Sequence, residues 1–453
     1  MPKIDAKFKS AIKETGHLLN VWLPLRLGYD KVPGASIAIV YKYKTLYQKG
    51  FGYADIESKT KADENTLYHI ASISKTFTSV AILQLVEQSK LRLDDSVSKY
   101  VNWFKGESKE GKLEDITIRQ LLSNTSGIWR DGDTHHWVTG KFPKDLKSSA
   151  NKSLIFEPFS EFKYSNYGFS VLGEVIKSVS GLSYEKYVQK HILEALSMAS
   201  TASDYAEKLK NVASGYGRVI PDSTREKFDH YATNAYAPAT GFVSSAADLA
   251  KYLSALPLKA TEKILLKKSK REMIQPYKET DDNDKYCLGI EINKIGNKKV
   301  YGHGGGFNGF TTQIAFDQED ELGVIVLTNA LRTPIWVYAQ SIFQAIYNLV
   351  ENESDYLSKK KVDGKVYEGI YRNPWGDQVV IKLKDTLVAF DMNTNSPLNK
   401  NNKRFLQPKT KNVFTLKGGG GFDSKGESAR FADIKNGKAN LATFGATPSK
   451  RVQ

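Results

Sequence analysis

A serine and a lysine three residues apart, Ser72 and Lys75, stand immediately before a long apolar segment. At the start of a helix this spacing places the hydroxyl and the amine on one face. A serine hydroxyl becomes a useful nucleophile only when a base takes its proton, and a desolvated lysine amine can be that base. Free backbone N–H groups at a helix start point to the same place. The spacing therefore predicts a nucleophile, its base and part of an oxyanion hole.

Two further motifs could complete such a site, although the first, taken alone, is more simply explained as an ordinary turn anchored by a tyrosine. The first is Tyr164-Ser165-Asn166, which precedes a helical stripe of apolar residues. A tyrosine there can exchange protons as a phenolate if cations lower its pKa, and the asparagine can hydrogen-bond Lys75 and a substrate amide. The second is His303-Gly304-Gly305-Gly306, where glycines let a substrate backbone approach a strand edge. The N–H of Gly306 is a candidate second oxyanion donor.

Strand patterns lie at both ends of the first 350 residues, and a helix-rich stretch from about 91 to 255 lies between them. The expected strands span residues 35–40, 45–53, 286–292, 299–303, 311–316 and 322–328. Helices are expected near both ends, over residues 7–23 and 334–350. This order predicts an α+β fold, in which one antiparallel sheet is flanked by helices and carries an inserted helical subdomain. A cleft between sheet and subdomain would hold the motifs.

A polar, charged segment near residues 351–363 separates this region from a C-terminal part with short alternating runs and frequent turn residues. We expect a first domain over residues 1–355, a linker over 356–366 and a second domain over 367–453. The strand and turn pattern of the last part predicts a small all-β domain, a barrel or a curved sheet.

The three motifs, in this order, resemble those of the serine β-lactamase and penicillin-binding-protein superfamily. The resemblance is closer to its class C branch, which includes class C β-lactamases, D-alanyl-D-alanine carboxypeptidases, D-aminopeptidases and family VIII esterases. It covers nearly all of residues 10–350 and includes family-like phrases at residues 121–127, 240–245 and 302–307. The C-terminal segment around residues 367–371 resembles the small β domain appended to many members of this branch.

The resemblance implies roles for individual residues. It makes Ser72 the acylated nucleophile, Lys75 its base and Tyr164 the acid–base partner of Lys75. It assigns substrate binding to Asn166, His303, Gly305 and Gly306 and implies neither a metal nor a cofactor. In true β-lactamases a lysine and a hydroxyl of the third motif help to hold the substrate carboxylate, and here His303 and Gly304 replace them. We therefore expect poor hydrolysis of β-lactam antibiotics.

The resemblance implies a serine hydrolase that acts on a short-chain ester or on a small peptide with a D-amino acid. Two alternatives stay open. One is a penicillin-binding D-Ala-D-Ala carboxypeptidase or a weak class C-type β-lactamase. The other is a non-catalytic scaffold or polymer-forming homologue, which the presence of Ser72, Lys75 and Tyr164 disfavours.

Composition and motifs predict neither a nucleic-acid partner nor stable membrane insertion, and leave open weak attraction to anionic surfaces and a homo-oligomer. The formal net charge is +15, but the lysine clusters lack interleaved aromatic residues, so we expect no nucleic-acid binding. No apolar stretch has the length of a membrane span, so we expect no stable membrane insertion. The N-terminal residues lack the apolar core of a signal peptide, which predicts a cytoplasmic location, or a periplasmic or secreted one if a leader has been removed.

One loop gathers potential metal ligands, namely Asp131, Asp133, His135 and His136. Carboxylate and imidazole groups are common zinc ligands, but a polar loop at the rim of a cleft has the same composition. We favour the polar loop, and expect no metal site.

Overall fold

The computed structural model describes residues 4–132, 136–147, 153–280, 284–358, 360, 362–419 and 425–452. The chain divides into two compact units, one of Pro33–Ile335 and one that joins Met1–Val32 to Trp336–Gln453. The terminal helices α1 (Ala6–Tyr29) and α9 (Ile335–Glu351, except for its first residue) thus belong with the C-terminal part. This division differs from the sequence-based boundaries, which placed both helices in the first domain.

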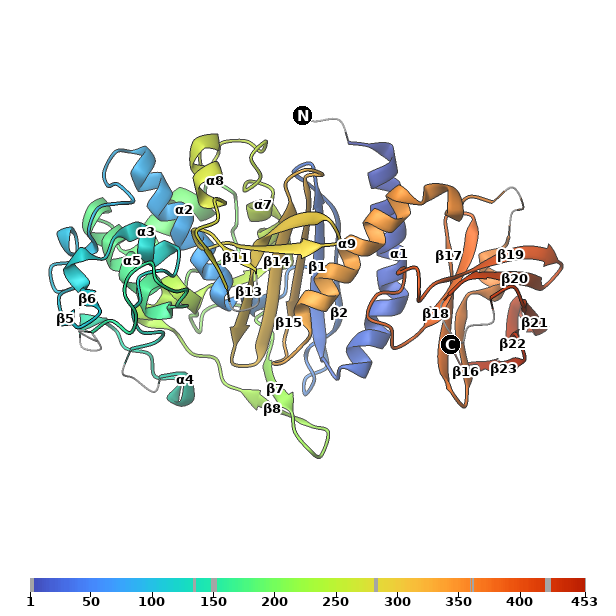
Figure 1. The fold of residues 1–453 in the computed structure, drawn as a ribbon. Coiled ribbons are helices and arrows are strands. Elements are labelled where there is room, and N and C mark those ends of the chain that lie inside the picture. Colours follow the sequence, from blue (N-terminus) through green and yellow to red (C-terminus); the bar gives the residue numbers. More distant parts are fainter. Residues whose placement is uncertain are drawn as a thin grey trace. The chain divides into compact units, whose positions relative to one another are not determined.

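The larger unit contains an antiparallel sheet with nine strands among the described residues (Figure 1). From edge to edge the strands are β10 (Lys278–Glu279), β11 (Lys285–Tyr286), β12 (Glu291–Ile295), β13 (Lys298–Phe307), β14 (Phe310–Asp317), β15 (Leu322–Thr328), β1 (Gly34–Tyr41), β2 (Lys44–Asp55) and β3 (Thr60–Lys61). Every residue of β1 and β15 is buried, which explains their continuous apolar sequences. The sheet joins strands from both ends of the unit, as the sequence predicts.

The helices of this unit come mainly from the middle of its sequence, and Figure 1 shows α2, α3 and α5 gathered beside the sheet. They are α2 (Ser74–Glu87), α3 (Ile118–Leu122), α4 (His136–Thr139), α5 (Asn166–Ser180), α6 (Tyr184–Val188), α7 (Ala246–Leu253) and α8 (Lys267–Met273). Residues 74–85 of α2 are all buried, so the polar side chains of its first turns lie inside the molecule together with its apolar ones. Short strand pairs complete the unit: β4 (Leu67–His69) with β9 (Val243–Ser245), β5 (Glu107–Ser108) with β6 (Gly111–Lys112), and β7 (Gly215–Val219) with β8 (Arg225–Phe228).

One expected strand is interrupted. The sequence predicts a single strand over residues 286–292, but the structure has β11 and β12 with a tight turn between them. In this turn Cys287 N donates to Ile290 O over 2.7 Å, and Gly289 has φ +71°, a conformation that glycine adopts without strain. The neighbouring β13 is longer than expected and continues through all three glycines to Phe307.

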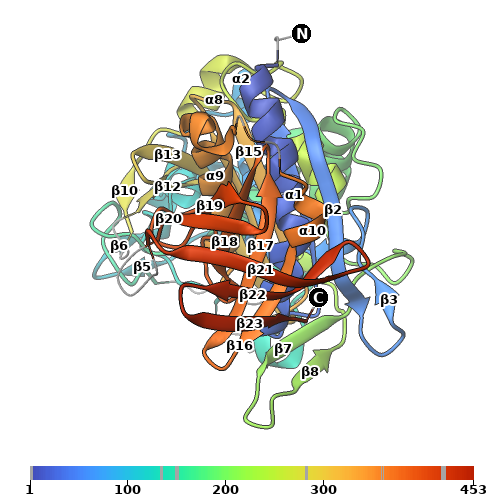
Figure 2. The ribbon, with the colours of Figure 1, turned by 90° about the vertical axis from the view of Figure 1, so that its right-hand side faces the viewer.

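The C-terminal part folds into a closed antiparallel barrel, which confirms the expected all-β domain (Figure 2). Its strands are β16 (Gly369–Asn373), β17 (Gly376–Leu383), β18 (Thr386–Asp391), β19 (Arg404–Thr410), β20 (Val413–Gly418), β21 (Ser428–Lys435), β22 (Lys438–Phe444) and β23 (Thr447–Arg451). Pairing of β16 with β23 closes the barrel, and the short helix α10 (Gly364–Tyr367) precedes it. Edge-to-face aromatic contacts fill the interior, with the Phe414 and Phe431 rings 5.6 Å apart.

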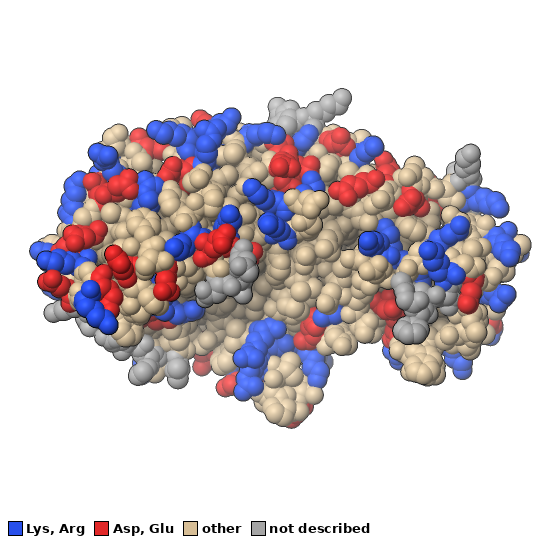
Figure 3. Space-filling model, viewed as in Figure 1, with Lys and Arg blue, Asp and Glu red and all other residues tan. Residues whose placement is uncertain are grey.

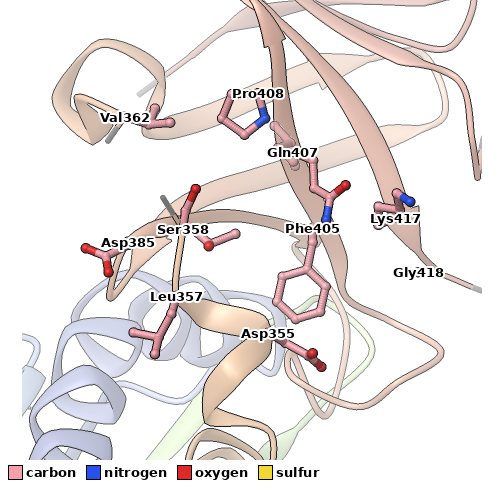
Figure 4. A pocket seen from close by; sticks show the side chains of 12 residues that line it. Asp355, Leu357, Ser358, Val362, Asp385, Phe405, Gln407, Pro408, Lys417 and Gly418 are labelled. Carbon is pink, nitrogen blue, oxygen red and sulfur yellow. The ribbon is translucent and has the colours of Figure 1, made fainter. Parts of the chain in front are cut away.

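The barrel unit has a cavity of about 330 Å³ beside β19 (Figure 4). Its lining combines carboxylates and a lysine with apolar side chains, including Asp355, Asp385, Phe405, Pro408 and Lys417. None of the three sequence motifs contributes to this cavity.

Basic residues are spread over the visible face of the molecule and alternate with acidic ones (Figure 3). This distribution resembles a solvated surface more than a continuous basic patch. Among the described residues, no helix combines the length and the apolar character that crossing a bilayer requires.

Candidate active site

Ser72 lies in a single 3-10 turn, η1 (Ala71–Ile73), that leads into α2. The sequence places Ser72 at the start of the helix itself, but α2 begins two residues later. Ala71 has φ +50°, which is disfavoured for a residue with a Cβ atom and is a kind of strain often found at functional sites. Thr312 of β14 holds the turn by donating to the Ile70 carbonyl over 3.1 Å. The nucleophile candidate is therefore fixed to the sheet as well as to the helix.

Lys75 is fully buried in the first turn of α2, and its amine has three polar neighbours. Nζ lies 2.7 Å from Asn166 Oδ1, 2.8 Å from the Ala239 carbonyl oxygen and 3.2 Å from Ser72 Oγ. Burial holds the pKa of Lys75 well below its ordinary value, because desolvation disfavours the ammonium form. A neutral amine has two hydrogens, and the first two neighbours can only accept them. In that neutral form the lone pair would face Ser72, whereas the ammonium form donates to Ser72 Oγ.

The Ala239 carbonyl is a site group that sequence analysis missed. It comes from η7 (Ala237–Gly241), a single π-helical turn. Such turns are frequent at functional sites. The turn is tied to α2, since Thr78 Oγ1 donates to the Pro238 carbonyl over 2.6 Å. The family-like phrase at residues 240–245 was the available signal, but it gives no indication of which carbonyl faces Lys75.

Tyr164 completes the contacts of Ser72, with its OH 2.7 Å from Ser72 Oγ. Lys75 Nζ lies 4.7 Å from the centre of the same ring and Arg130 Cζ lies 5.3 Å from it. The phenolate form was conditional on cations that lower the pKa of Tyr164, and here burial raises this pKa above its ordinary value despite these cations. Tyr164 is therefore a phenol that donates its hydrogen to Ser72 Oγ.

The loop over residues 121–127 positions the second motif. Asn124 has φ +54° and its side-chain oxygen accepts from the Ser165 backbone N–H over 3.0 Å. The Asn124 carbonyl accepts from Lys163 N over 2.8 Å, so both sides of Tyr164 are anchored. Ser165 caps α5 through Gly168 N, and Asn166 is the first residue of the helix. This explains why the family-like phrase and the tyrosine motif occur together.

The third motif lies on β13, next to the turn that carries Ser72. A Cβ atom on Gly305 would lie 2.3 Å from the Ile70 carbonyl oxygen, so only glycine fits at this crossing. Gly306 is exposed and has open space around it. Within the described residues, positions 303–307 of β13 pair with β14 alone, because β12 ends opposite Gly302. One strand edge beside Ser72 is thus available to an extended ligand.

His303 presents no N–H group to a ligand. Its Nδ1 lies 2.6 Å from the Gly304 carbonyl, which can only accept, so Nδ1 carries the proton. Nε2 is 3.2 Å from Tyr286 OH and accepts from it. Burial and the nearby Lys75 lower the pKa of His303 to about 3, so the ring is neutral. The Glu291 carboxyl lies 3.8 Å from Nε2, and burial raises its pKa to about 7. Sequence analysis missed both Tyr286 and Glu291.

Asn166 connects Lys75 to the loop that carries the candidate metal ligands. Its Nδ2 donates to Asp131 Oδ1 over 2.7 Å, while its oxygen accepts from Lys75. Of the other loop residues, Asp133 and His135 lie outside the described part of the chain, and His136 packs against Phe142 and Tyr236. No group of three or more metal-binding side chains occurs among the described residues.

Comparison with known proteins identifies the family. The sequence profile named Beta-lactamase matches residues 26–338, more than half of the chain. The chain belongs to the beta-lactamase family. With the fold described above, this confirms the resemblance to the serine β-lactamase and penicillin-binding-protein superfamily.

Individual relatives agree with this assignment. Protein flp of Staphylococcus aureus (strain MW2) is 33% identical over 306 residues, which are 66% of this chain and 60% of that protein. The chain thus matches less than two thirds of the length of this relative. Penicillin-binding protein 4* of Bacillus subtilis (strain 168) is 27% identical over 354 residues, 71% of this chain and 75% of that protein. The solved structure of an octameric penicillin-binding protein homologue from Pyrococcus abyssi has a TM-score of 0.64 and 26% identity, and covers 96% of this chain and 99% of its own.

Proposed function

We propose that this chain is a serine hydrolase that forms a covalent acyl intermediate on Ser72. The observation that carries the proposal is the position of Ser72 Oγ, 2.7 Å from Tyr164 OH and 3.2 Å from Lys75 Nζ. The lysine is buried and its other contacts are acceptors, so the neutral amine can take the serine proton. A side chain that merely capped a helix would need neither neighbour.

The contacts support a defined path for the protons. Ser72 Oγ attacks a carbonyl carbon while its proton moves to Lys75. Tyr164, which already donates to Ser72 Oγ, gives its proton to the leaving group and regains one from the Lys75 ammonium. Water then releases the acyl group by the reverse sequence. The backbone N–H groups of Ser72 and Gly306 are the proposed donors to the oxyanion.

Small esters or amides without a carboxylate beside the scissile bond are the proposed substrates, for example a short-chain ester or a D-amino-acid peptide. The support is the third motif, where His303 is neutral and offers only acceptor capacity, and Glu291 lies 3.8 Å from it. A carboxylate needs donors or cations, so penicillin-type substrates would bind weakly there. The test below distinguishes this proposal from the three alternatives left open by the sequence: a penicillin-binding carboxypeptidase, a weak β-lactamase and a non-catalytic scaffold.

The test compares initial rates of p-nitrophenyl butyrate hydrolysis by the wild type and by Ser72→Ala, with nitrocefin and D-alanine p-nitroanilide in parallel. Ester or anilide turnover that depends on Ser72 supports the proposal. Thermal unfolding of Ser72→Ala confirms that the variant is folded. Full turnover by Ser72→Ala would refute the acyl-serine mechanism, and the absence of both turnover and fluorophosphonate labelling would favour the scaffold.

We also propose that the chain forms a homo-oligomer. The support is the octameric Pyrococcus abyssi homologue, whose similarity extends over 96% of this chain. Light scattering on the full chain should give a mass that is a multiple of 50.6 kDa. A monomer mass at high protein concentration would exclude the oligomer.

A further inference from the structure

We propose that Asp131 is a positioning residue of the acylation site, whose carboxylate fixes the Asn166 amide so that the amide oxygen faces Lys75. The inference rests on the proposed acylation of Ser72. It assigns a role to a side chain that the sequence placed in a polar surface loop. Asn166 Nδ2 donates to Asp131 Oδ1 over 2.7 Å and Asn166 Oδ1 lies 2.7 Å from Lys75 Nζ.

The argument depends on the polarity of the three groups. A side-chain amide has one donating end and one accepting end, whereas a carboxylate only accepts. A reversed Asn166 amide would place its oxygen against Asp131, where no hydrogen is available, and its NH₂ group against Lys75, which could accept only through its lone pair. Lys75 would then turn a hydrogen toward Ser72 in place of its lone pair. One orientation alone satisfies all three side chains, and Asp131 selects it.

Asp131 is itself held in place from several elements, as a positioning residue must be. Trp137 Nε1 of α4 donates to Asp131 Oδ1 over 2.9 Å, and Arg130 Nε donates to Oδ2 over 3.2 Å. Tyr236 OH donates to the Asp131 backbone carbonyl over 2.6 Å. The carboxylate thus has donors on both oxygens and a fixed backbone, so it presents a stable acceptor to Asn166.

The charge of Asp131 should affect the pH dependence of acylation, which a purely structural role of Asp131 would not do. Burial is the main cause of the lowered pKa of Lys75; Asp131 and Glu291 act against it, and Arg130 reinforces it. The Tyr164 phenol and the neutral His303 ring also face the amine. Loss of the Asp131 charge should lower the pKa of Lys75, and loss of the Arg130 charge should raise it. Acylation requires neutral Lys75, so the acylation rate falls as the pH drops below the pKa of Lys75. This fall, the acid limb of the pH profile, should move in opposite directions in the two variants.

The experiment measures the rate of fluorophosphonate labelling of the full chain as a function of pH. We expect Asp131→Asn to label about tenfold more slowly at the plateau, because a misplaced base loses near-attack geometry. Its acid limb should move to lower pH, whereas that of Arg130→Gln should move to higher pH. Trp137→Phe keeps an aromatic side chain but removes one donor that holds Asp131, and should also slow labelling.

Asp248→Asn is the matched control, since Asp248 accepts from Ser200 N, Thr201 and Lys251 and contacts none of the site residues. It should change neither the rate nor the acid limb. Labelling of Asp131→Asn at the wild-type rate would overturn the inference, and so would slower labelling with an unmoved acid limb. Absence of labelling in the wild type would instead refute the proposed function, so the two failures are distinguishable.

Discussion

In the proposed mechanism, the hydrogen-bond partners of Lys75 and Tyr164 matter to the activation of Ser72 as much as the identity of these two residues. A lysine amine in water is protonated and useless as a base, but Lys75 is fully buried among two fixed acceptors. Tyr164 stays protonated for the same reason, since burial raises its pKa. The same desolvation thus shifts the two pKa values in opposite directions, which favours the proposed roles of Lys75 as base and Tyr164 as acid.

Tyr164→Phe tests the acid role, because it removes the hydroxyl and keeps the ring that packs against Lys75 and Arg130. We expect the kcat for p-nitrophenyl butyrate to fall by about 10²- to 10⁴-fold, with an unchanged thermal midpoint. Tyr286→Phe is the control, since its ring lies 6.4 Å from that of Tyr164 and its hydroxyl contacts His303. Equal losses in the two variants would argue against a special role for Tyr164.

His303→Lys tests the recognition of carboxylates. In the wild type we expect kcat/KM for the ester to exceed that for nitrocefin by roughly a hundredfold or more, because the neutral ring offers no donor to the cephalosporin carboxylate. A lysine at position 303 would add a positive charge, part of which Glu291 would neutralise. The remaining charge would attract the cephalosporin carboxylate, so the ratio of the kcat/KM values for ester and nitrocefin should become smaller. His303→Gln adds no charge and should leave the ratio wide. Efficient nitrocefin hydrolysis by the wild type would contradict this prediction.

At the residue scale the sequence predicts the contacts between side chains that belong to the recognisable motifs. Ser72, Lys75 and Tyr164 do meet, and Asn166 reaches Lys75. The contact of the Ala239 carbonyl with Lys75 could not be predicted, because every residue has a backbone carbonyl. Only the π-helical turn η7 directs this one toward Lys75. Asp131 was noticed, but as a candidate ligand, because its partner Asn166 is remote in sequence.

The crossing of β13 over η1 decides how the elements form the site. Gly305 lets the strand touch the turn that carries Ser72, and Thr312 of the next strand bonds to the same Ile70 carbonyl. Two glycines of the motif thus have different reasons to be there. Gly305 allows close packing, whereas Gly306 has open space around it and lies on the unpaired edge.

Gly305→Ala and Gly306→Ala form a matched pair that separates these reasons. The new Cβ at 305 would meet the Ile70 oxygen at 2.3 Å, a backbone atom that can move only with η1. We expect a loss of stability of about 1–3 kcal/mol and a large loss of ester turnover. Gly306→Ala keeps its N–H and should leave the thermal midpoint unchanged. Equal stability of the two variants would contradict the packing argument.

Sequence patterns predict the regular elements well and their interruptions poorly. The neighbouring strands β1 and β2 and the strand β15 agree with expectation, because runs of apolar residues specify them. The break between β11 and β12 and the 3-10 start of α2 were not predicted. Both depend on tertiary contacts, such as Gly289 N to the Leu122 carbonyl, that no local pattern reveals.

At the scale of the whole molecule, the ends of the chain belong to one unit although the sequence separates them. Trp22 and Arg26 of α1 donate to the carbonyls of Thr394 and Asn393 in the barrel part. Ser396 donates to Gln344 of α9 over 2.6 Å. The pairings of α1 span more than 300 positions and that of α9 spans 52, and neither leaves a periodic signal in the sequence, so the sequence-based boundaries placed both helices with the larger domain.

The His17–Glu368 pair offers a pH test of this grouping. His17 Nε2 lies 3.2 Å from Glu368 Oε1, and this contact raises the pKa of His17 above 6.5, since it outweighs desolvation. Between 6.5 and the raised pKa the folded chain binds more protons than the unfolded one, so the pair stabilises fully below pH 6.5 and loses its effect as pH rises. We expect His17→Gln to lower stability by at most about 1 kcal/mol, at acidic pH only.

Chemical denaturation of the full chain across this pH range measures the effect, and His191→Gln provides a control of opposite sign. Burial and two lysines lower the pKa of His191, so its unfolded form binds more protons than the folded one below 6.5. Replacing His191 should therefore stabilise the chain at acidic pH and have little effect at alkaline pH. If both variants shifted stability in the same direction, or if neither effect depended on pH, the contact between α1 and the barrel would not operate in solution as the structure describes it.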